Sequence, residues 1–324
     1  TDLQPYIDQL GATLSTAPGI EVSPVTTHAN LFPMAYQKDE RARGSIPLAV
    51  IDENGDPVQR TIPEMLDLAR NHPSVPIIQI NHGRRSSGFF TTVEHDPSTN
   101  PYDNDHPRYS SQYDAMEVVN EWSTTCDLFN DWASHLNVGA PITATGNSDS
   151  HGIWGNAGYP RNYLHIPGAG AGTTDVADVR DAILNQKVVV AGNVFVNFTD
   201  GVLPGDTLTV QPNVATDFSV RVQSPTFSVA EKIAVVVNGD VVQEIDISGN
   251  DASAVVDFDG FLQVSTDVDA WVVFVALGPR ITAEVHTNRH VFGFTNPVYL
   301  DVGGDGVTPP GPKLMDFITP FNTF

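Results

Sequence analysis

Five side chains of the kinds that bind metal ions lie in or directly after short apolar segments. They are Glu21, His28, His82, Asp149 and His151. Carboxylate oxygen and imidazole nitrogen together suit Zn, Mn or Fe, because the carboxylate neutralises charge while histidine supplies a neutral nitrogen. Asp149 and His151 are two residues apart, so both would project to the same side of an extended chain. These residues predict a site for one divalent transition-metal ion or for two neighbouring ions.

Predicted strands would position these side chains. The strands are GIEV at 19–22, PIIQIN at 76–81 and PITAT at 141–145. The predicted helices are at 61–71, 128–139 and 175–187. This alternation is typical of parallel strands with helical crossovers, which carry their sites at the carboxyl ends of the strands. We therefore expect Glu21, His82 and Asp149 to meet at one rim, with His28 folding back over it.

The second half of the sequence has a different pattern. From about Val188 onward short β-branched runs replace the alternation, and Asn238-Gly239 is a strong hairpin signal. These features predict an α/β fold: an incomplete barrel over 1–190 followed by an all-β immunoglobulin-like sandwich over 191–300. Residues 301–324 are expected to form an extended tail.

Composition limits the classes of partner. The 324 residues are 40% hydrophobic, enough for a sizeable core. Sixteen Lys and Arg against 39 Asp and Glu give a net charge of -23, which repels nucleic acid and anionic lipid. Cys126 is the single cysteine, so no intrachain disulfide can form. We expect a small-molecule substrate, no nucleic-acid partner and no membrane span; self-association stays open.

Four segments resemble successive motifs of the polymerase and histidinol phosphatase (PHP) metallohydrolases. They are GIEVSPVTTHANLFP, IIQINHGR, YDAMEVVN and ATGNSDSHGIWGNAGYPRNYLHI. The similarity is to the branch named after carbaryl hydrolase, covers about residues 1–200, and implies a distorted (βα)7 barrel. The His-x-His and Thr-Asp-His elements of the family's first two strands do not occur in the sequence. The resemblance therefore implies a barrel without those strands.

The resemblance also implies roles for the metal-binding residues. Glu21 would bridge, His28 and His82 would complete one metal, Asp149 would ligate a second, and His151 would help hold a third. The expected activity is metal-dependent hydrolysis of a phosphoester, or of a carboxyl ester or carbamate, by activated water. We expect Asp149 to orient this water and handle its proton.

Four basic side chains are candidates for substrate binding. They are Arg84, Arg85, His106 and Arg161. A guanidinium group can hold a phosphate or carboxylate by two hydrogen bonds, and the alternative for Arg84 and Arg85 is an ion pair within this acidic protein. His106 lies in a long polar segment that is either a lid or a surface excursion. Arg161 follows Gly-Tyr-Pro and is expected to face the site.

Each metal-binding candidate also has a structural alternative. Glu21 could pair with an arginine, His28 could be an exposed loop residue, and His82 could be a hydrogen-bonded core histidine. Asp149 and His151 could belong to a helix cap or an Asx-turn. The alternative function is a non-catalytic scaffold with a degenerate metal site and a carbohydrate- or protein-binding sandwich. The acidic surface and absent disulfide favour a periplasmic or secreted protein, with a cytoplasmic one left open.

Overall fold

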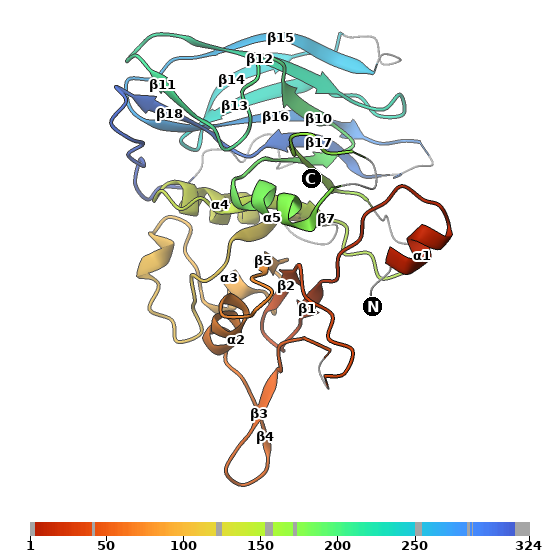
Figure 1. Cartoon of the computed structure of the whole chain (residues 1–324). Coiled ribbons are helices and arrows are strands. Elements are labelled where there is room, and N and C mark those ends of the chain that lie inside the picture. Colours follow the sequence, from red (N-terminus) through yellow and green to blue (C-terminus); the bar gives the residue numbers. More distant parts are fainter. Residues whose placement is uncertain are drawn as a thin grey trace.

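Strands dominate the structure, a computed structural model in which they make up 35% of residues against 14% for helices. The described residues are 4–40, 43–120, 125–152, 158–170, 174–249, 255–283, 286 and 288–314. In Figure 1 the strand-rich second half lies above α4 and α5, and the first sheet lies with α2 below them. The candidate site belongs to this lower part.

The first sheet has five strands in the order β1-β2-β5-β6-β7. Their bounds are β1 (Ile20–Val22), β2 (His28–Phe32), β5 (Ile77–Asn81), β6 (Ala115–Asn120) and β7 (Thr143–Asn147). β2 runs antiparallel to both β1 and β5, whereas β5, β6 and β7 run parallel. β6 is buried along its whole length, as its continuous apolar sequence predicts.

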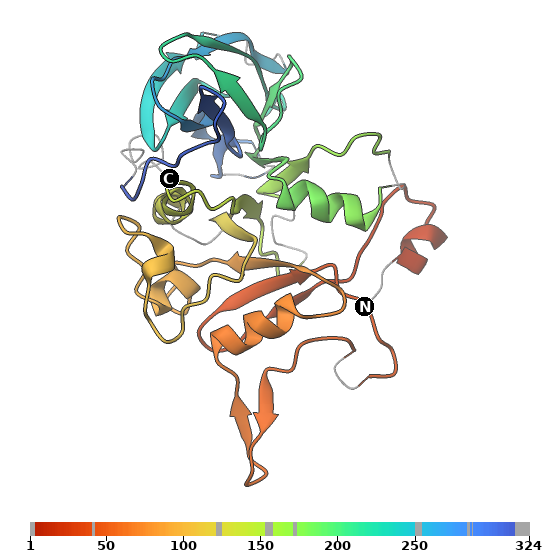
Figure 2. The ribbon, with the colours of Figure 1, turned by 60° about the vertical axis from the view of Figure 1, so that its left-hand side comes forward.

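Two helices pack on this sheet. Thr61 caps α2 (Ile62–Arg70) in a capping box with Glu64, as predicted, and α2 buries its apolar face over β1 and β2 (Figure 2). α4 (Thr125–Leu136) joins β6 to β7 and packs Phe129 against Phe294 of the second half, with ring centroids 4.7 Å apart. The other helices are α1 (Gln4–Gln9), α3 (Phe89–Thr92), the 3-10 turn η1 (Pro101–Asp103) and α5 (Val176–Leu184).

The second half consists of two further sheets that enclose their own apolar core. One has the order β10-β12-β15, and the other has the order β11-β18-β16-β17-β9-β8, with β13 paired to β16 and β14 paired to β13. The bounds are β8 (Arg161–Leu164), β9 (Val188–Gly192), β10 (Phe195–Phe198), β11 (Thr207–Val210), β12 (Thr216–Gln223), β13 (Lys232–Val237), β14 (Asp240–Asp246), β15 (Val256–Val264), β16 (Ala270–Arg280), β17 (His290–Thr295) and β18 (Val298–Val302). Asn238 and Gly239 form the turn between β13 and β14.

The predicted α/β fold with an incomplete (βα)7 barrel is wrong. The described residues form a mostly β structure, and no closed barrel is seen among them. The five residues between β1 and β2 are too few for a helical crossover, so these strands pair antiparallel. β8 and β9 likewise pair antiparallel and join the large sheet of the second half.

The segment IPLAVID at 46–52 contains a strand that lies outside the larger sheets. β3 (Ala49–Ile51) pairs only with β4 (Pro57–Gln59), and all six residues are exposed. This hairpin projects from the bottom of the molecule in Figure 1. Its apolar residues therefore face solvent.

The two halves are joined by buried hydrogen bonds. The predicted boundary at 190/191 falls inside β9, and Asn296 binds both Ala144 of β7 and Val188 of β9 through their backbone groups. The Trp271 indole donates to Asn137 Oδ1 at 2.9 Å, and Gly311 of the tail donates to Asn137 O at 2.9 Å. None of the described helices has the length and apolar character that crossing a membrane requires.

Candidate metal centre

Glu21, His28 and His82 form a group that could hold a metal ion. One ligand atom from each lies within 4.8 Å of the other two. Glu21 Oε1 is 3.2 Å from His28 Nδ1 and 3.8 Å from His82 Nε2, and the two rings meet edge to face with centroids 4.8 Å apart. His82 is buried, while about a third of the Glu21 and His28 side chains is exposed.

Strand direction explains why these residues meet. His28 is the first residue of β2 and pairs with Asn81, the last residue of β5, because the two strands run antiparallel. His82 follows directly. Glu21 lies on β1, the next strand along, where Asn81 Nδ2 donates to Glu21 Oε1 at 3.1 Å. The start of one strand and the end of its neighbour thus form a single edge.

The donor set fits a divalent transition metal. An ion held tetrahedrally at roughly 2.0–2.1 Å from its ligands needs ligand atoms about 3.3 Å apart. The distances from Glu21 Oε1 to His28 Nδ1 and His82 Nε2, 3.2 and 3.8 Å, are close to this spacing. Two histidines and one glutamate are also a recurrent catalytic zinc set, with one position left open.

The His82 backbone adopts an uncommon conformation. Its φ of 31° lies in the left-handed region, which a non-glycine residue occupies only when its surroundings enforce it. The His82 N–H donates to Glu117 Oε2 at 2.6 Å, and Asn120 Nδ2 donates to the same oxygen at 3.1 Å. The buried Nδ1 of His82 has no hydrogen-bond partner among the described residues. This turn therefore points the Nε2 side of the ring at Glu21.

The charges at the site favour an ion pair in the metal-free protein. Burial lowers the pKa of His82, but Glu21, Glu117 and Asp149 outweigh burial and raise that pKa above its usual 6.5. The His82 imidazole, assisted by Asn81 and His28, lowers the pKa of Glu21 to about 2. Burial raises the pKa of Glu117 to about 7, against the opposing effect of the His82 N–H.

Replacing Glu21 by glutamine is expected to bring the His82 pKa below 6.5, because the carboxylate that raises it is lost while burial remains. NMR titration of the histidine rings in metal-free protein measures this change. The raised His82 pKa and the lowered Glu21 pKa mean that the ion pair stabilises the fold fully between about pH 4.5 and pH 6.5, and that this contribution is lost as the pH falls through the Glu21 pKa of about 2. This contribution is also lost as the pH rises through the His82 pKa. A wild-type midpoint below 6.5 would contradict the ion pair.

Asp149 and His151 do not join the three-residue group. Asp149 has a φ of 48°, and its Oδ2 lies 3.9 Å from Arg85 Nη2. The His151 side chain is 79% exposed, and its Nδ1 lies 2.6 Å from the Asp149 carbonyl oxygen, at hydrogen-bond distance. Asp149 was expected to ligate a second ion and His151 to help hold a third, but among the described residues neither belongs to a group of three potential metal ligands. Asp149 instead lines a polar cavity beside Glu21.

That polar cavity has a volume of about 300 Å³ and is open to solvent. Glu21, Glu117 and Asp149 supply carboxyl groups to its wall, and Arg161 supplies a guanidinium. Arg161 Nη2 donates to Asn193 Oδ1 at 3.2 Å, while its buried Nε has no partner among the described residues. Arg161 is therefore placed where it can meet a ligand in the cavity.

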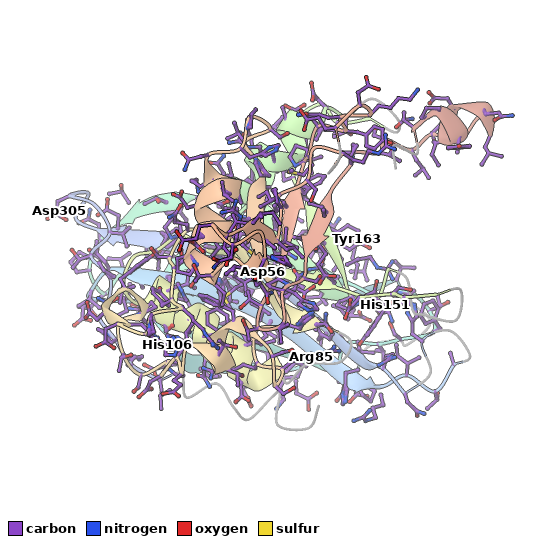
Figure 3. The ribbon with its side chains drawn as sticks, turned by 90° about the horizontal axis from the view of Figure 1, so that it is seen from below. Asp56, Arg85, His106, His151, Tyr163 and Asp305 are labelled. Atoms are coloured by element: carbon purple, nitrogen blue, oxygen red, sulfur yellow. The ribbon has the colours of Figure 1, made fainter. Side chains whose placement is uncertain are left out.

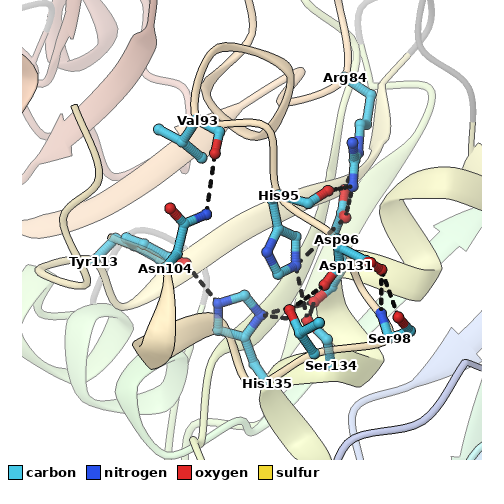
Figure 4. Close-up of polar contacts among 11 residues, drawn as sticks. Arg84, Val93, His95, Asp96, Ser98, Asn104, Tyr113, Asp131, Ser134 and His135 are labelled. Atoms are coloured by element: carbon cyan, nitrogen blue, oxygen red, sulfur yellow. Dashed lines mark hydrogen bonds and ion pairs between the residues drawn. The ribbon is translucent and has the colours of Figure 1, made fainter. Parts of the chain in front are cut away.

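Arg84 lies elsewhere, which corrects its predicted contact with substrate. Figure 4 shows its guanidinium bound to the Asp131 carboxylate of α4. Arg84 Nε donates to Asp131 Oδ2 at 2.7 Å, and Nη2 donates to Oδ1 and to His95 O, the latter at 2.9 Å. Asp131 is fully buried. Arg84 therefore forms an ion pair within the protein, which was the alternative to substrate binding.

Two neutral histidines complete this buried network. His135 Nδ1 bonds the Asp131 carbonyl oxygen at 2.7 Å, and the Tyr113 hydroxyl lies 2.5 Å from His135 Nε2. Burial lowers the pKa of His135 to about 4 and that of His95 to about 3. A neutral His135 thus donates from Nδ1 and accepts from Tyr113 at Nε2.

The remaining basic candidates differ in position. Arg85 lies beside Asp149 and remains near the site. The His106 Nδ1 accepts a hydrogen bond from the Arg108 N–H at 3.2 Å. His106 does not line the polar cavity. Figure 3 shows His106 apart from His151, with Arg85 between them in that view. The segment that holds His106 packs Phe89 and Phe90 into the core, so it is docked and not an open excursion.

The sequence analysis missed several polar residues of the site. They are Asn30, Gln79, Asn81, Glu117, Thr145, Asn147 and Asn162. A signal existed for Glu117, because a carboxyl group in the middle of the otherwise apolar run AMEVVN must be buried at a cost. The amides lie within or beside strands, where a sequence pattern does not tell an inward from an outward side chain.

A comparison of the chain with models of known protein families, with characterised proteins and with solved structures finds no match. The similarity to PHP metallohydrolases therefore stays a resemblance of motifs.

Proposed function

We propose that the chain is a metal-dependent hydrolase that cleaves a phosphoester, or a carboxyl ester or carbamate, with an activated water. The Glu21, His28 and His82 group carries this proposal, since it offers two nitrogens and one oxygen at metal-binding distances. The motif resemblance to PHP enzymes supports the same reaction class. Zn, Mn and Fe all suit these ligands.

A bound ion would act as a Lewis acid and lower the pKa of a water in its open position. The chain's own groups would do the rest. Asp149 faces the polar cavity with 16% of its side chain exposed, so its carboxylate can orient a water and accept its proton. Arg85, beside Asp149, and Arg161, across the cavity, can hold the negative oxygen of the substrate.

The experiment uses metal-free protein reloaded with Zn, Mn or Fe. The substrates are 4-nitrophenyl phosphate, bis(4-nitrophenyl) phosphate, 4-nitrophenyl acetate and a 4-nitrophenyl carbamate. We expect metal-dependent release of nitrophenol from at least one class. Asp149→Asn should lower kcat by about a hundredfold or more while leaving metal affinity intact, since Asp149 lies outside the ligand group.

The rival is a non-catalytic metal-binding scaffold. The separation of His151 from the ligand group favours it, because one ion site remains where the resemblance implied three. If wild-type protein turned over no faster than the His82→Ala variant with every metal and every substrate, the hydrolase proposal would be wrong and the scaffold would be the better description.

A further inference from the structure

A second and larger cavity adjoins the polar one. Its volume is about 460 Å³, within the usual range for small-molecule pockets, and it shares Glu21, Asn30, Asn147 and Asn162 with the polar cavity. The rest of its wall is mostly apolar. Its apolar lining includes Ile20, Phe32, Ile77, Leu164, Ile183 and Val188. A molecule bound beside Glu21 therefore has apolar space next to it.

The polar groups between the two cavities mostly satisfy one another. Asn81 donates to Glu21 at 3.1 Å, Gln79 Nε2 to Asn81 at 2.9 Å, and Thr145 Oγ1 to Gln79 at 3.0 Å. Nearby, Asn162 Nδ2 donates to Asn147 at 3.3 Å. Groups paired in this way have little need of a polar ligand.

Asn30 is the exception among these amides. It lies opposite Glu21 in the pairing of β1 with β2 and lines both cavities. Within the residues that the structure describes, its side-chain amide makes no hydrogen bond, and it is half-buried. Asn30 thus offers a donor and an acceptor at the junction of the cavities.

We infer that the larger cavity binds an aryl or alkyl group of the substrate, and that the Asn30 amide binds a substrate oxygen next to this group. The inference rests on the proposed function and adds the class of substrate: an ester or phosphoester with an apolar substituent beside the cleaved bond. A polar substituent would be disfavoured, because the apolar wall cannot replace its hydrogen bonds to water.

Binding is tested first without metal and without turnover. The probe is 4-butylphenol, followed by NMR of isoleucine methyl groups. The methyls of Ile20, Ile77 and Ile183 are expected to shift with one saturating curve, while that of Ile51, 68% exposed on β3, stays unmoved. Absence of shifts at the three cavity methyls would overturn the inference without recourse to any variant.

Variants then locate the probe. Ala17 lines the larger cavity from the segment before β1, so Ala17→Trp should fill part of the space and weaken probe binding by about tenfold or more. Val58→Trp on the exposed hairpin is the matched control and should bind as wild type. Equal affinity in both tryptophan variants would place the probe outside this cavity and contradict the inference.

Kinetics on the metal-loaded protein separate this inference from the proposed function. We expect a lower KM for 4-nitrophenyl hexanoate than for the acetate, and Ala17→Trp should remove that advantage. Asn30→Ala should raise KM for both esters by about tenfold while preserving the preference. Hydrolysis of acetate without probe binding would overturn the apolar subsite alone, whereas probe binding without any hydrolysis would support the subsite and overturn the hydrolase.

Discussion

Replacing His82 by alanine is expected to weaken zinc binding by at least about a hundredfold, since it removes one of three ligands and even supporting residues around metal sites are worth ten- to a hundredfold. Glu21 and His28 would remain with too few donors to exclude competing water. Calorimetric titration of metal-free protein at pH 7.5 measures the affinity, and a thermal melt checks that the variant folds.

His151→Ala is the matched control for this experiment. The His151 side chain is 79% exposed and lies outside the ligand group, although the motif resemblance gives it a metal. Its substitution should change zinc affinity by no more than about twofold, within the range of a surface change. If His151→Ala lost as much zinc affinity as His82→Ala, the ion would not be bound by Glu21, His28 and His82 alone.

Asp131→Leu is expected to destabilise the fold by about 3 kcal/mol, because it leaves the largely buried Arg84 guanidinium, 19% exposed, without its counter-charge. Asp131 is fully buried and accepts two hydrogen bonds from Arg84. Burial and the ion pair act on the Asp131 carboxyl in opposite directions: complete burial raises its pKa to about 7, although Arg84 lowers it. Urea denaturation measures the change in the free energy of unfolding.

A double substitution tests whether the pair itself is responsible. Arg84→Met with Asp131→Leu should cost less than the sum of the two single changes, since it leaves neither charge unpaired. Asp259→Asn is the surface control, because it breaks the Arg221–Asp259 ion pair, in which the Arg221 side chain is 40% exposed and the Asp259 side chain 49%. It should lower the free energy of unfolding by less than about 1 kcal/mol. Additive costs in the buried pair would mean that its members act independently.

The Arg84 pair also has a position that bears on the metal centre. Arg84 is two residues after His82, with Gly83 between them, and a side chain on Gly83 would come within 2.4 Å of the Phe90 ring. The turn after β5, which contains the left-handed His82, is thus bound to Asp131 through Arg84 and packed against Phe90 at Gly83.

The sequence predicted the three ligands better than the fold that brings them together. The residue types of Glu21, His28 and His82 pointed to one edge, and the structure places them there. The expected cause was a row of parallel strands. The observed cause is the antiparallel β2, which a single-sequence pattern could not distinguish from a loop because HANLF is short and follows two threonines.

The prediction for Asp149 and His151 fails for a local reason. Side chains alternate between two sides only along an extended chain, and the φ of 48° at Asp149 departs from that geometry. His151 consequently turns to solvent while Asp149 faces the cavity. The residue types in NSDSHG do not predict this particular turn, since Asn, Asp and Ser all suit several turn conformations.

The adjacent arginines show a further limit of sequence reasoning. Arg84 and Arg85 have the same chemistry, but Arg84 reaches the buried Asp131 and Arg85 reaches Asp149 at the cavity. The partner of Arg84 lies 47 residues later on α4, so only tertiary structure decides which arginine faces the core.

X-ray absorption at the zinc edge, on protein loaded with one equivalent of zinc, measures which side chains bind the ion. We expect about one ion per chain with two imidazole nitrogens and a carboxylate oxygen at roughly 2.0–2.2 Å. A spectrum without histidine scattering, or identical spectra from wild type and His82→Ala, would contradict a metal centre built from Glu21, His28 and His82.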